Sequence, residues 1–370
     1  MKLRARKEAL LPALSRVTGA TERKSASQSL PPGLIGIQSS DGRLVFDGTD
    51  GEIAWQASTD EFSCDEHFRI AVQGKLLLDV LRQAPSEADV EFSVKQDKIE
   101  VVYGRSTFGL SIVAFEDRLM WSVADESEDI ALDVAAEDLR RWLDATSFAM
   151  AVKDVRYFLE GILISVEGGS IHIVATDGHR LAHWVDTITL ENNASVSAII
   201  PRRAIAEIRR NLSGFSDNIQ LRLGQSSGSV FLGTDRFDFR LIEGKYPDYE
   251  RVIPKKQEKP VSVSASDLLK AIQRVSLVAN DRNQSVRLKF DGSEIVVRSS
   301  SDHNEAFESV KAQIEQENLE IGFNPQYLID VLTLAGDEDV LLSLRDSASS
   351  ARVDIPSVPN ARYVVMPIRL

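Results

Sequence analysis

The stretch Glu8-Ala-Leu-Leu-Pro-Ala-Leu-Ser-Arg-Val-Thr18 sets a pattern that the chain repeats as Glu137-Asp-Leu-Arg-Arg-Trp-Leu-Asp-Ala-Thr-Ser147 and as Ser266-Asp-Leu-Leu-Lys-Ala-Ile-Gln-Arg-Val-Ser276. Successive copies lie 129 residues apart, and Leu10, Leu139 and Leu268 take the same place in each copy. One supersecondary plan is therefore used three times, and this repeat governs the interpretation of every other feature.

Two further patterns recur in the same order. A second helical pattern occurs as Leu76-Leu-Leu-Asp-Val-Leu81, Ala204-Ile-Ala-Glu-Ile-Arg209 and Leu328-Ile-Asp-Val-Leu332. A strand followed by a turn occurs around Thr49-Asp50-Gly51, Thr176-Asp177-Gly178 and Ser301-Asp302-His303. Because order and spacing are kept together, the sequence predicts three domains of ordinary size, at residues 1–124, 130–253 and 259–370.

The strands of each repeat are short and alternate between apolar and polar residues. Apolar positions of period two occur at Arg43–Phe46, Ile171–Ala175 and Val286–Phe290. Asp291-Gly292 then joins the last of these to Glu294–Arg298, which is typical of a hairpin. Two helices and several antiparallel strands per repeat predict an α+β fold, and not a parallel sheet.

Composition places the chain among soluble globular proteins. Apolar residues make up 43% of its 370 residues and charged residues 27%. No run of eighteen apolar residues exists, so no membrane span or membrane partner is expected. The N-terminus is charged but lacks the apolar segment of a signal peptide, and we interpret it as the start of a cytoplasmic protein. Cys64 is the single cysteine, which excludes an internal disulfide and a thiolate-rich metal site.

Positive charge is concentrated on the helices of the repeat, although the net charge of the chain is −13. The segment Pro201–Asn211 carries four arginines against one glutamate. These helices could simply be solvated, or they could together form one basic surface. Such a surface would bind phosphates there alone, without reading sequence and with strong salt dependence.

The most enzyme-like segment is Ala175-Thr-Asp-Gly-His-Arg-Leu181, in which Asp177 and His179 could be drawn as an acid and base pair of a hydrolase. The repeat argues against that interpretation, because Asp50 and Asp302 occupy the same turn without a following His-Arg. Asp-Gly at a strand end is ordinary turn chemistry. We therefore expect no catalytic site, no metal site and no cofactor; neither a Walker loop nor a nucleophile elbow occurs.

The chain ends Tyr363-Val-Val-Met-Pro-Ile-Arg-Leu370, which is unusually apolar for a terminus. It is either an edge strand that completes the third sheet or the lining of a surface groove. Met366 suits the groove, because a thioether side chain adapts to different ligands. Leu159, Leu181, Pro247 and Val252 could supply the rest of such a groove.

Four motifs together resemble the bacterial sliding clamp family, the beta subunit of the replicative DNA polymerase holoenzyme. They are Asp154-Val-Arg-Tyr-Phe-Leu-Glu-Gly161, Ala175-Thr-Asp-Gly-His-Arg-Leu-Ala182, Gly244-Lys-Tyr-Pro-Asp-Tyr249 with Arg251-Val-Ile-Pro254, and the C-terminal eight residues. The resemblance implies a head-to-tail homodimer whose six domains form a closed ring, with helices lining the hole. It implies a processivity factor without catalysis, which encircles duplex DNA regardless of sequence.

The resemblance also implies partners and site residues. Partners are the polymerase catalytic subunit, the clamp loader, and other polymerases and repair proteins that insert a short peptide beginning with glutamine. The peptide groove is expected at Leu159, Thr176, Gly178, His179, Arg180, Leu181, Pro247, Arg251, Val252, Val364, Val365, Met366, Pro367, Ile368, Arg369 and Leu370. The DNA contacts are expected at Arg23, Lys24, Lys75, Arg82, Arg140, Arg141, Arg202, Arg203, Arg209, Arg210, Lys270 and Arg274. The dimer contacts are expected at Phe108 and Leu110 on one chain and at Leu277 and Val278 on the other.

The first repeat departs from the family pattern, with Gly48-Thr-Asp-Gly51 where the family has Gly-Thr-Asp-Leu. Two alternatives to a main replicative clamp are open, the first of them because of this departure. One is a specialised second clamp. The other is a monomeric adaptor that keeps the peptide groove and does not encircle DNA, and sedimentation of the 40.9 kDa chain distinguishes it from a dimer.

Overall fold

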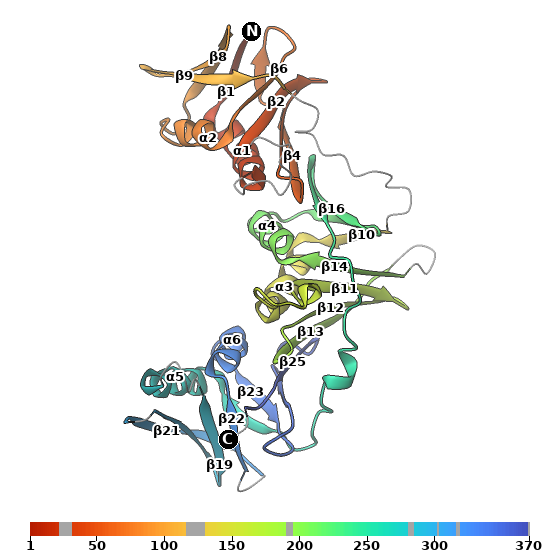
Figure 1. The fold of residues 1–370 in the computed structure, drawn as a ribbon, viewed down its shortest axis with the longest axis vertical. Coiled ribbons are helices and arrows are strands. Elements are labelled where there is room, and N and C mark those ends of the chain that lie inside the picture. Colours follow the sequence, from red (N-terminus) through yellow and green to blue (C-terminus); the bar gives the residue numbers. More distant parts are fainter. Residues whose placement is uncertain are drawn as a thin grey trace. The chain divides into compact units, whose positions relative to one another are not determined.

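The computed structural model describes residues 1–21, 32–115, 130–189, 195–279, 285–301, 303–315 and 319–368. They divide into two compact units, Met1–Arg140 with Ala206–Leu241, and Arg141–Ile205 with Ile242–Leu370. Figure 1 shows both units as mixtures of helices and antiparallel strands, which confirms the predicted α+β class. Among the described residues, none of the helices combines the length and apolarity that crossing a membrane requires.

The three repeats have the same order of elements, except that the first contains one additional short strand, β5. The first runs β1 (Lys2–Arg6), α1 (Lys7–Thr21), β2 (Leu34–Ser40), β3 (Arg43–Thr49), β4 (Ile53–Thr59), β5 (Phe62–Cys64), β6 (Arg69–Gln73), α2 (Gly74–Arg82), β7 (Asp89–Lys95), β8 (Lys98–Tyr103) and β9 (Ser106–Val113). The second runs β10 (Ile130–Ala135), α3 (Ala136–Thr146), β11 (Gly161–Glu167), β12 (Ser170–Thr176), β13 (Arg180–Thr187), β14 (Val196–Pro201), α4 (Arg202–Leu212), β15 (Asn218–Leu223), β16 (Ser227–Leu232) and β17 (Asp235–Arg240). The third runs β18 (Val261–Ser264), α5 (Ala265–Val275), β19 (Val286–Asp291), β20 (Glu294–Ser300), β21 (Glu305–Gln313), β22 (Leu319–Phe323), α6 (Pro325–Ala335), β23 (Asp339–Ser343), β24 (Ala351–Asp354) and β25 (Ala361–Val365).

The spacing of the sequence repeat is also the spacing of the structure. The helices α1, α3 and α5 begin at Lys7, Ala136 and Ala265, which are 129 residues apart. The equivalent apolar positions of these helices are all buried: Leu10, Leu14, Leu139, Leu143, Leu268 and Ile272. Helix α1 packs on α2 and α5 packs on α6, as Figure 1 also shows. The repeated apolar stripe therefore forms the core beneath each sheet.

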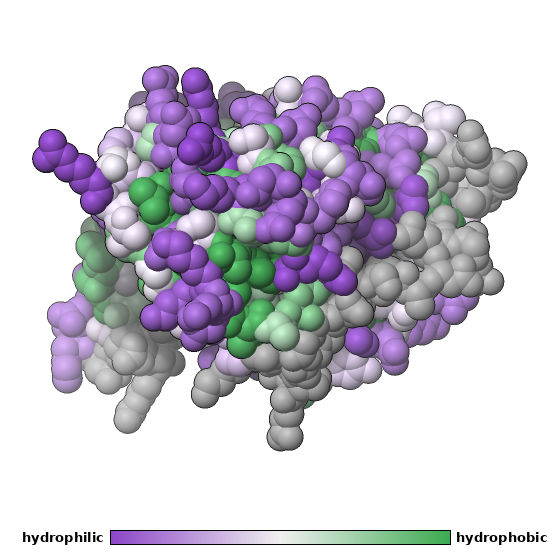
Figure 2. Space-filling model, turned by 90° about the horizontal axis from the view of Figure 1, so that it is seen from above, coloured by the Kyte–Doolittle hydropathy of each residue, from purple (hydrophilic) through white to green (hydrophobic). Residues whose placement is uncertain are grey.

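Local chemistry explains where several elements begin and turn. The Asn324 side chain accepts a hydrogen bond from the Gln326 amide at 2.9 Å and caps α6, whose first residue is Pro325. Gly292 has a φ of 59° in the turn between β19 and β20, so the predicted Asp-Gly hairpin is confirmed. Hydrophilic residues cover most of the coloured surface that Figure 2 shows, and hydrophobic residues gather near its centre.

Each unit contains one continuous antiparallel sheet in which a strand from a later repeat joins strands of an earlier one. In the first unit β17 pairs with β4, and in the second unit β25 pairs with β13. Strand β25 also pairs with β24 on its other side. Of the two interpretations of the C-terminal segment, the edge strand is therefore wrong, because β25 has hydrogen-bonded neighbours on both sides.

Candidate peptide-binding groove

The groove is built around the turn between β12 and β13. The carboxylate of Asp177 accepts hydrogen bonds from the amides of His179 and Arg180, at 2.8 and 3.0 Å. The hydroxyl of Thr176 accepts from the Gly178 amide at 3.0 Å and donates to the Arg180 carbonyl at 2.6 Å. Gly178 has a φ of 85°, a conformation that favours glycine. The Thr-Asp-Gly motif thus shapes the turn, and its aspartate acts as a turn residue.

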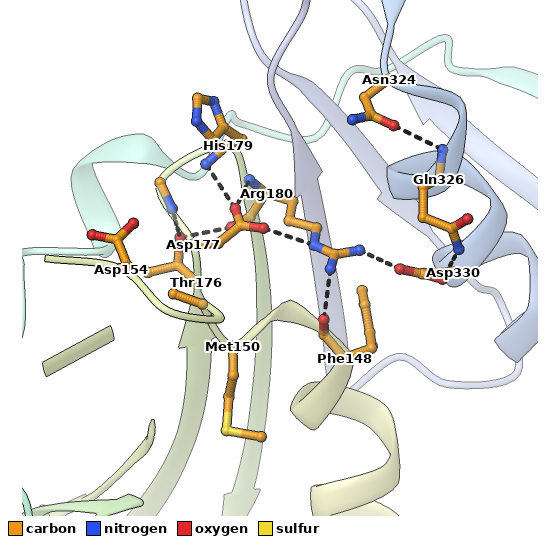
Figure 3. Close-up of polar contacts among 12 residues, drawn as sticks. Phe148, Met150, Asp154, Thr176, Asp177, His179, Arg180, Asn324, Gln326 and Asp330 are labelled. Carbon is orange, nitrogen blue, oxygen red and sulfur yellow. Dashed lines mark hydrogen bonds and ion pairs between the residues drawn. The ribbon is translucent and has the colours of Figure 1, made fainter. Parts of the chain in front are cut away.

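Arg180 connects this turn to two neighbouring elements, as Figure 3 shows. Its guanidinium donates to Asp177 at 3.0 Å, to the Phe148 carbonyl at 2.8 Å and to the carboxylate of Asp330 on α6. The ring of Tyr327 lies 4.7 Å from the same guanidinium. Only 12% of the Arg180 side chain is exposed, and its positive charge is paired with the carboxylates of Asp177 and Asp330. Arg180 therefore holds the turn against α6.

An apolar cavity of about 280 Å³ opens beside the turn. Its lining includes nine residues that the sequence predicted: Leu159, Thr176, Gly178, Arg180, Leu181, Pro247, Val252, Val364 and Met366. Its floor belongs to a buried hydrophobic cluster that contains Leu159, Leu181 and Val364. Val252 and Met366 are 53% and 46% exposed, which leaves apolar surface available at the rim. Such a concave apolar site with few polar groups suits the side chains of a short hydrophobic ligand.

One buried and one half-buried tyrosine support this floor. The Tyr246 hydroxyl accepts a hydrogen bond from the Thr176 amide at 3.1 Å, and burial raises the pKa of this phenol. Burial first, and the neighbouring Glu250 and Asp248 carboxylates second, raise the pKa of Tyr249 to about 12. Both phenols therefore stay neutral at physiological pH. The Tyr246 hydroxyl donates a hydrogen bond to the Val174 carbonyl at 3.4 Å.

The rim carries charge that is mostly paired. Arg156 donates to both oxygens of Asp154, at 3.0 and 2.8 Å, and to the Asp177 carbonyl at 2.9 Å. These hydrogen bonds lower the pKa of the Asp154 carboxyl to about 2. Arg251 pairs with Asp248 at 2.6 Å, although its side chain is 84% exposed. The groove therefore combines a neutral floor with a rim of arginine–aspartate pairs.

The remaining predicted groove residues lie elsewhere. Val365 is fully buried, because alternation along β25 places it on the opposite face of the strand from Val364 and Met366. The ring of His179 stacks on Tyr327 with centroids 6.3 Å apart. Pro367 is half-buried, and Ile368 bonds through its amide to the Gly322 carbonyl at 2.8 Å. Arg369 and Leu370 lie outside the described residues.

Sequence reasoning missed several lining residues. Arg156, Phe158, Asp248, Tyr249 and Ser350 line the cavity and were not predicted. Phe158 and Tyr249 lie within the motifs quoted above, so their aromatic character was an available signal. Ser350 follows β23 in a loop distant along the chain, and no local pattern could have placed it here.

The basic residues predicted to contact DNA all lie on helices where they are described. Lys75, Arg82, Arg140, Arg141, Arg209, Arg210, Lys270 and Arg274 are exposed, and Arg203 is half-buried. Arg210 pairs with Glu207 at 2.6 Å, and Arg274 donates to Glu308 at 2.8 Å. Arg23 and Lys24 lie outside the described residues.

Arg202 differs from the other predicted DNA contacts in bonding to main-chain carbonyls. Its guanidinium donates to the carbonyls of Met150, at 2.7 Å, and Ala151, at 3.0 and 3.3 Å. Burial lowers the pKa of the Arg202 guanidinium, and the side chain ties the start of α4 to the segment after α3. Nε and Nη2 of Arg202 are thus engaged within the fold, which favours a structural role for this residue.

The residues predicted for a dimer contact lie on or beside open strand edges. Phe108 is half-buried on β9 and stacks on Tyr103 with centroids 5.4 Å apart, whereas Leu110 is buried in the core. Leu277 is 84% exposed and Val278 is half-buried in the 3-10 turn Ser276–Val278. Among the described strands, β6 pairs only with the C-terminal end of β9, and β18 pairs only with the C-terminal end of β21. Within the described ranges, the remaining length of that edge of β9 and of β21 is open.

Known proteins with the same architecture decide the family. Models of the DNA polymerase III beta subunit match this chain with their N-terminal domain at residues 1–118, central domain at 133–248 and C-terminal domain at 250–369. A beta sliding clamp of Pseudomonas aeruginosa is 34% identical over 371 residues, covering 100% of both chains. The chain belongs to the DNA polymerase III beta subunit family.

Other relatives agree with this membership. The beta sliding clamp of Escherichia coli K12 is 31% identical over 371 residues and covers 100% of both chains. A sliding clamp from Pseudomonas aeruginosa, solved bound to griselimycin, superimposes with a TM-score of 0.93 at 34% identity, again over 100% of both chains. The resemblance inferred from four sequence motifs is confirmed over the whole chain.

Proposed function

We propose that this protein is a processivity clamp that encircles duplex DNA as a ring-shaped homodimer and tethers polymerases and repair proteins through the apolar groove. It acts as an accessory subunit without a catalytic site of its own. The observation that carries the proposal is the cavity of about 280 Å³, whose floor is apolar and whose rim includes the exposed Met366 and Val252. A short peptide with hydrophobic side chains fits that site, and a polar substrate does not.

The DNA contacts of this clamp are the exposed cations on the helices, with Arg202 excluded. Their side chains reach phosphates without reading bases, so the contacts are weak, mobile and sensitive to salt. The net charge of −13 keeps nucleic acid away from the rest of the surface. A closed ring needs no tighter contacts, because it leaves DNA only by opening or at an end. Tethering then raises the effective concentration of a polymerase at its template.

The dimer contact would join the open edge of β9 on one protomer to the open edge of β21 on its partner. Phe108 belongs to the first edge, whereas Leu277 and the 68% exposed Phe307 lie at the second. Antiparallel addition would satisfy the unpaired main-chain groups of both edges and bury these apolar side chains.

The ring is tested by topology. The full chain is loaded with its clamp loader and ATP onto nicked circular duplex, and bound protein is measured after gel filtration in high salt. Retention on circular DNA with rapid loss after one restriction cut is expected of a ring. Equal loss from circular and linear DNA would contradict encirclement, while peptide binding to the groove is measured separately by fluorescence anisotropy.

A further inference from the structure

An open hollow of about 740 Å³ lies next to the apolar groove and differs from it in charge. Its charged lining consists of Arg251, Lys255, Lys256 and Arg345, and no carboxylate lines it among the residues that the structure describes. In a chain whose net charge is −13, four cations around one hollow reverse the prevailing sign. Such a local reversal attracts anionic groups that the remaining surface repels.

The backbone that carries the two lysines is anchored on both sides. Arg352 donates to the Pro254 carbonyl at 3.2 Å, immediately before the lysines. The Gln257 amide, immediately after them, donates to the Ser343 hydroxyl at 3.2 Å. Lys255 and Lys256 therefore project from a fixed stretch of chain, which lowers the entropic cost of binding an anion between them.

The arginines of the hollow are already paired, and the lysines are not. Arg345 donates to Asp346 at 2.9 Å, and Arg251 pairs with Asp248 at 2.6 Å. Hydrogen bonds from Ser349 and Arg345 lower the pKa of the Asp346 carboxyl to about 2, so it stays charged. Across the described ranges, Lys255 and Lys256 form no ion pair and are exposed. They supply the uncompensated positive charge of the hollow.

We propose that this hollow binds acidic side chains that flank the hydrophobic core of the same partner peptide. The inference rests on the proposed function and extends it. Val252 and Ser350 line both the apolar groove and the hollow, so an extended peptide passes from one to the other without leaving the surface. Charge complementarity favours aspartate or glutamate in that extension and disfavours lysine or arginine.

Duplex DNA is the competing anion, and position argues against it. The described cations proposed to contact DNA lie on helices, whereas this hollow is formed by the segment after the 3-10 turn Glu250–Val252 and by the loop between β23 and β24. It is continuous with the groove that takes the peptide.

The test uses the full chain and four fluorescent peptides that share one core, an initial glutamine followed by hydrophobic residues. Two carry a pair of aspartates, at the N-terminal or the C-terminal side, and two carry asparagines there. We expect one aspartate peptide to bind about five-fold more tightly than its asparagine match in 50 mM salt, and equally in 500 mM salt. The Lys255→Gln/Lys256→Gln variant should lose this preference and keep its affinity for the asparagine peptides.

A matched variant, Lys259→Gln/Lys289→Gln, removes the same charge outside the hollow, where both lysines already pair with carboxylates, and should keep the preference. Equal binding of aspartate and asparagine peptides at low salt would overturn the inference but leave the proposed groove standing. Failure of every peptide to bind would overturn the groove itself. A preference that survives Lys255→Gln/Lys256→Gln, or a loss confined to duplex DNA binding, would also refute the acidic-peptide assignment.

Discussion

Two sheet joints of this protein have the same backbone plan and different surfaces. In the joint between β4 and β17, Ile53 pairs with Phe239 and Ala54 pairs with Asp238. In the joint between β13 and β25, Arg180 pairs with Val365 and Leu181 pairs with Val364. The hydrogen bond that follows the last pair is also shared, since the Arg240 amide donates to the Glu52 carbonyl at 3.0 Å and the Met366 amide donates to the His179 carbonyl at 2.8 Å.

The turns that precede these joints are equally similar. Asp50 accepts from the amides of Glu52 and Ile53, at 3.0 and 3.1 Å, as Asp177 does in the second joint. The joints differ in the side chains on the sheet face that lines the groove in the second joint. Where the second joint has Leu181, Val364 and Met366, the first has Ala54, the buried Asp238 and Arg240. The groove for hydrophobic side chains in the second joint therefore depends on the side chains placed on a backbone plan that both joints share.

The largest expected effect comes from moving the residue of the first joint into the second with Arg180→Ile. The substitution leaves Asp330 and the Phe148 carbonyl without their guanidinium, and we expect the free energy of unfolding to fall by about 3 kcal/mol. Urea denaturation measures it. The control is Arg251→Ile, whose ion pair is exposed and should contribute under about 1 kcal/mol. Similar small losses in both variants would show that Arg180 does not hold the turn.

The second prediction concerns Met366→Arg, which places at the groove the residue that Arg240 occupies in the first joint. A cationic side chain at an apolar rim should reduce peptide affinity about 30-fold, because roughly 2 kcal/mol of hydrophobic burial is lost. Thermal unfolding should change little, since Met366 is 46% exposed. Met366→Leu serves as the control and should bind normally. Undiminished affinity in Met366→Arg would exclude this rim from the peptide contact.

The third prediction tests the turn through Gly178→Ala. Alanine is strained at a φ of 85°, and its Cβ would meet Arg156 Nη1 at 2.6 Å. We expect a loss of about 2 kcal/mol in unfolding free energy. Gly214→Ala has a similar φ of 82° with nothing within 4 Å, and it should cost only about 1 kcal/mol. Equal losses would mean that Arg156 moves aside without cost.

The smallest expected effect is a pH dependence of stability. His183 is 1% exposed, and burial, followed by the neighbouring His172, lowers its pKa to about 3. Because the unfolded histidine binds a proton near pH 6.5 and the folded one does not, stability is full above pH 6.5 and declines as the pH falls towards 3. Between pH 7 and 5.5 the decline should be about 1 kcal/mol.

His183→Gln sharpens this comparison, because Gln56 occupies the equivalent position in the first joint. Urea denaturation at several pH values should show a smaller acid-dependent loss in this variant. His303→Gln, at an exposed site, should keep the slope of the natural chain. An unchanged slope in His183→Gln would exclude this ring as the source.

The sequence predicted local features well and non-local ones only in part. The two helices of each repeat, the hairpin at Asp291 and the turn role of Asp177 followed from apolar period and turn chemistry, which act within a few residues. For the C-terminal segment, the sequence did not decide between an edge strand and the lining of a groove. It proved to be an interior strand that also contributes Val364 and Met366 to the cavity, because pairing partners distant along the chain are not written in local pattern.

Charge was the other weak point of prediction from sequence. The sequence predicted Arg180 in the groove and Arg202 at the DNA, but not that Arg180 also bonds to Asp330 and Arg202 to main-chain carbonyls. Whether a guanidinium is exposed to ligands or bonded within the protein depends on groups that folding brings near it.

By itself, the amino-acid order determined the threefold repeat, the α+β class and the family, since each rests on periodicity or on motifs read along the chain. Tertiary structure alone decided that one joint of two equivalent ones is apolar, that Ser350 reaches its rim, and that lysines beside it face an open hollow. The physical reason is that burial and charge pairing are properties of surfaces assembled from segments far apart in the chain.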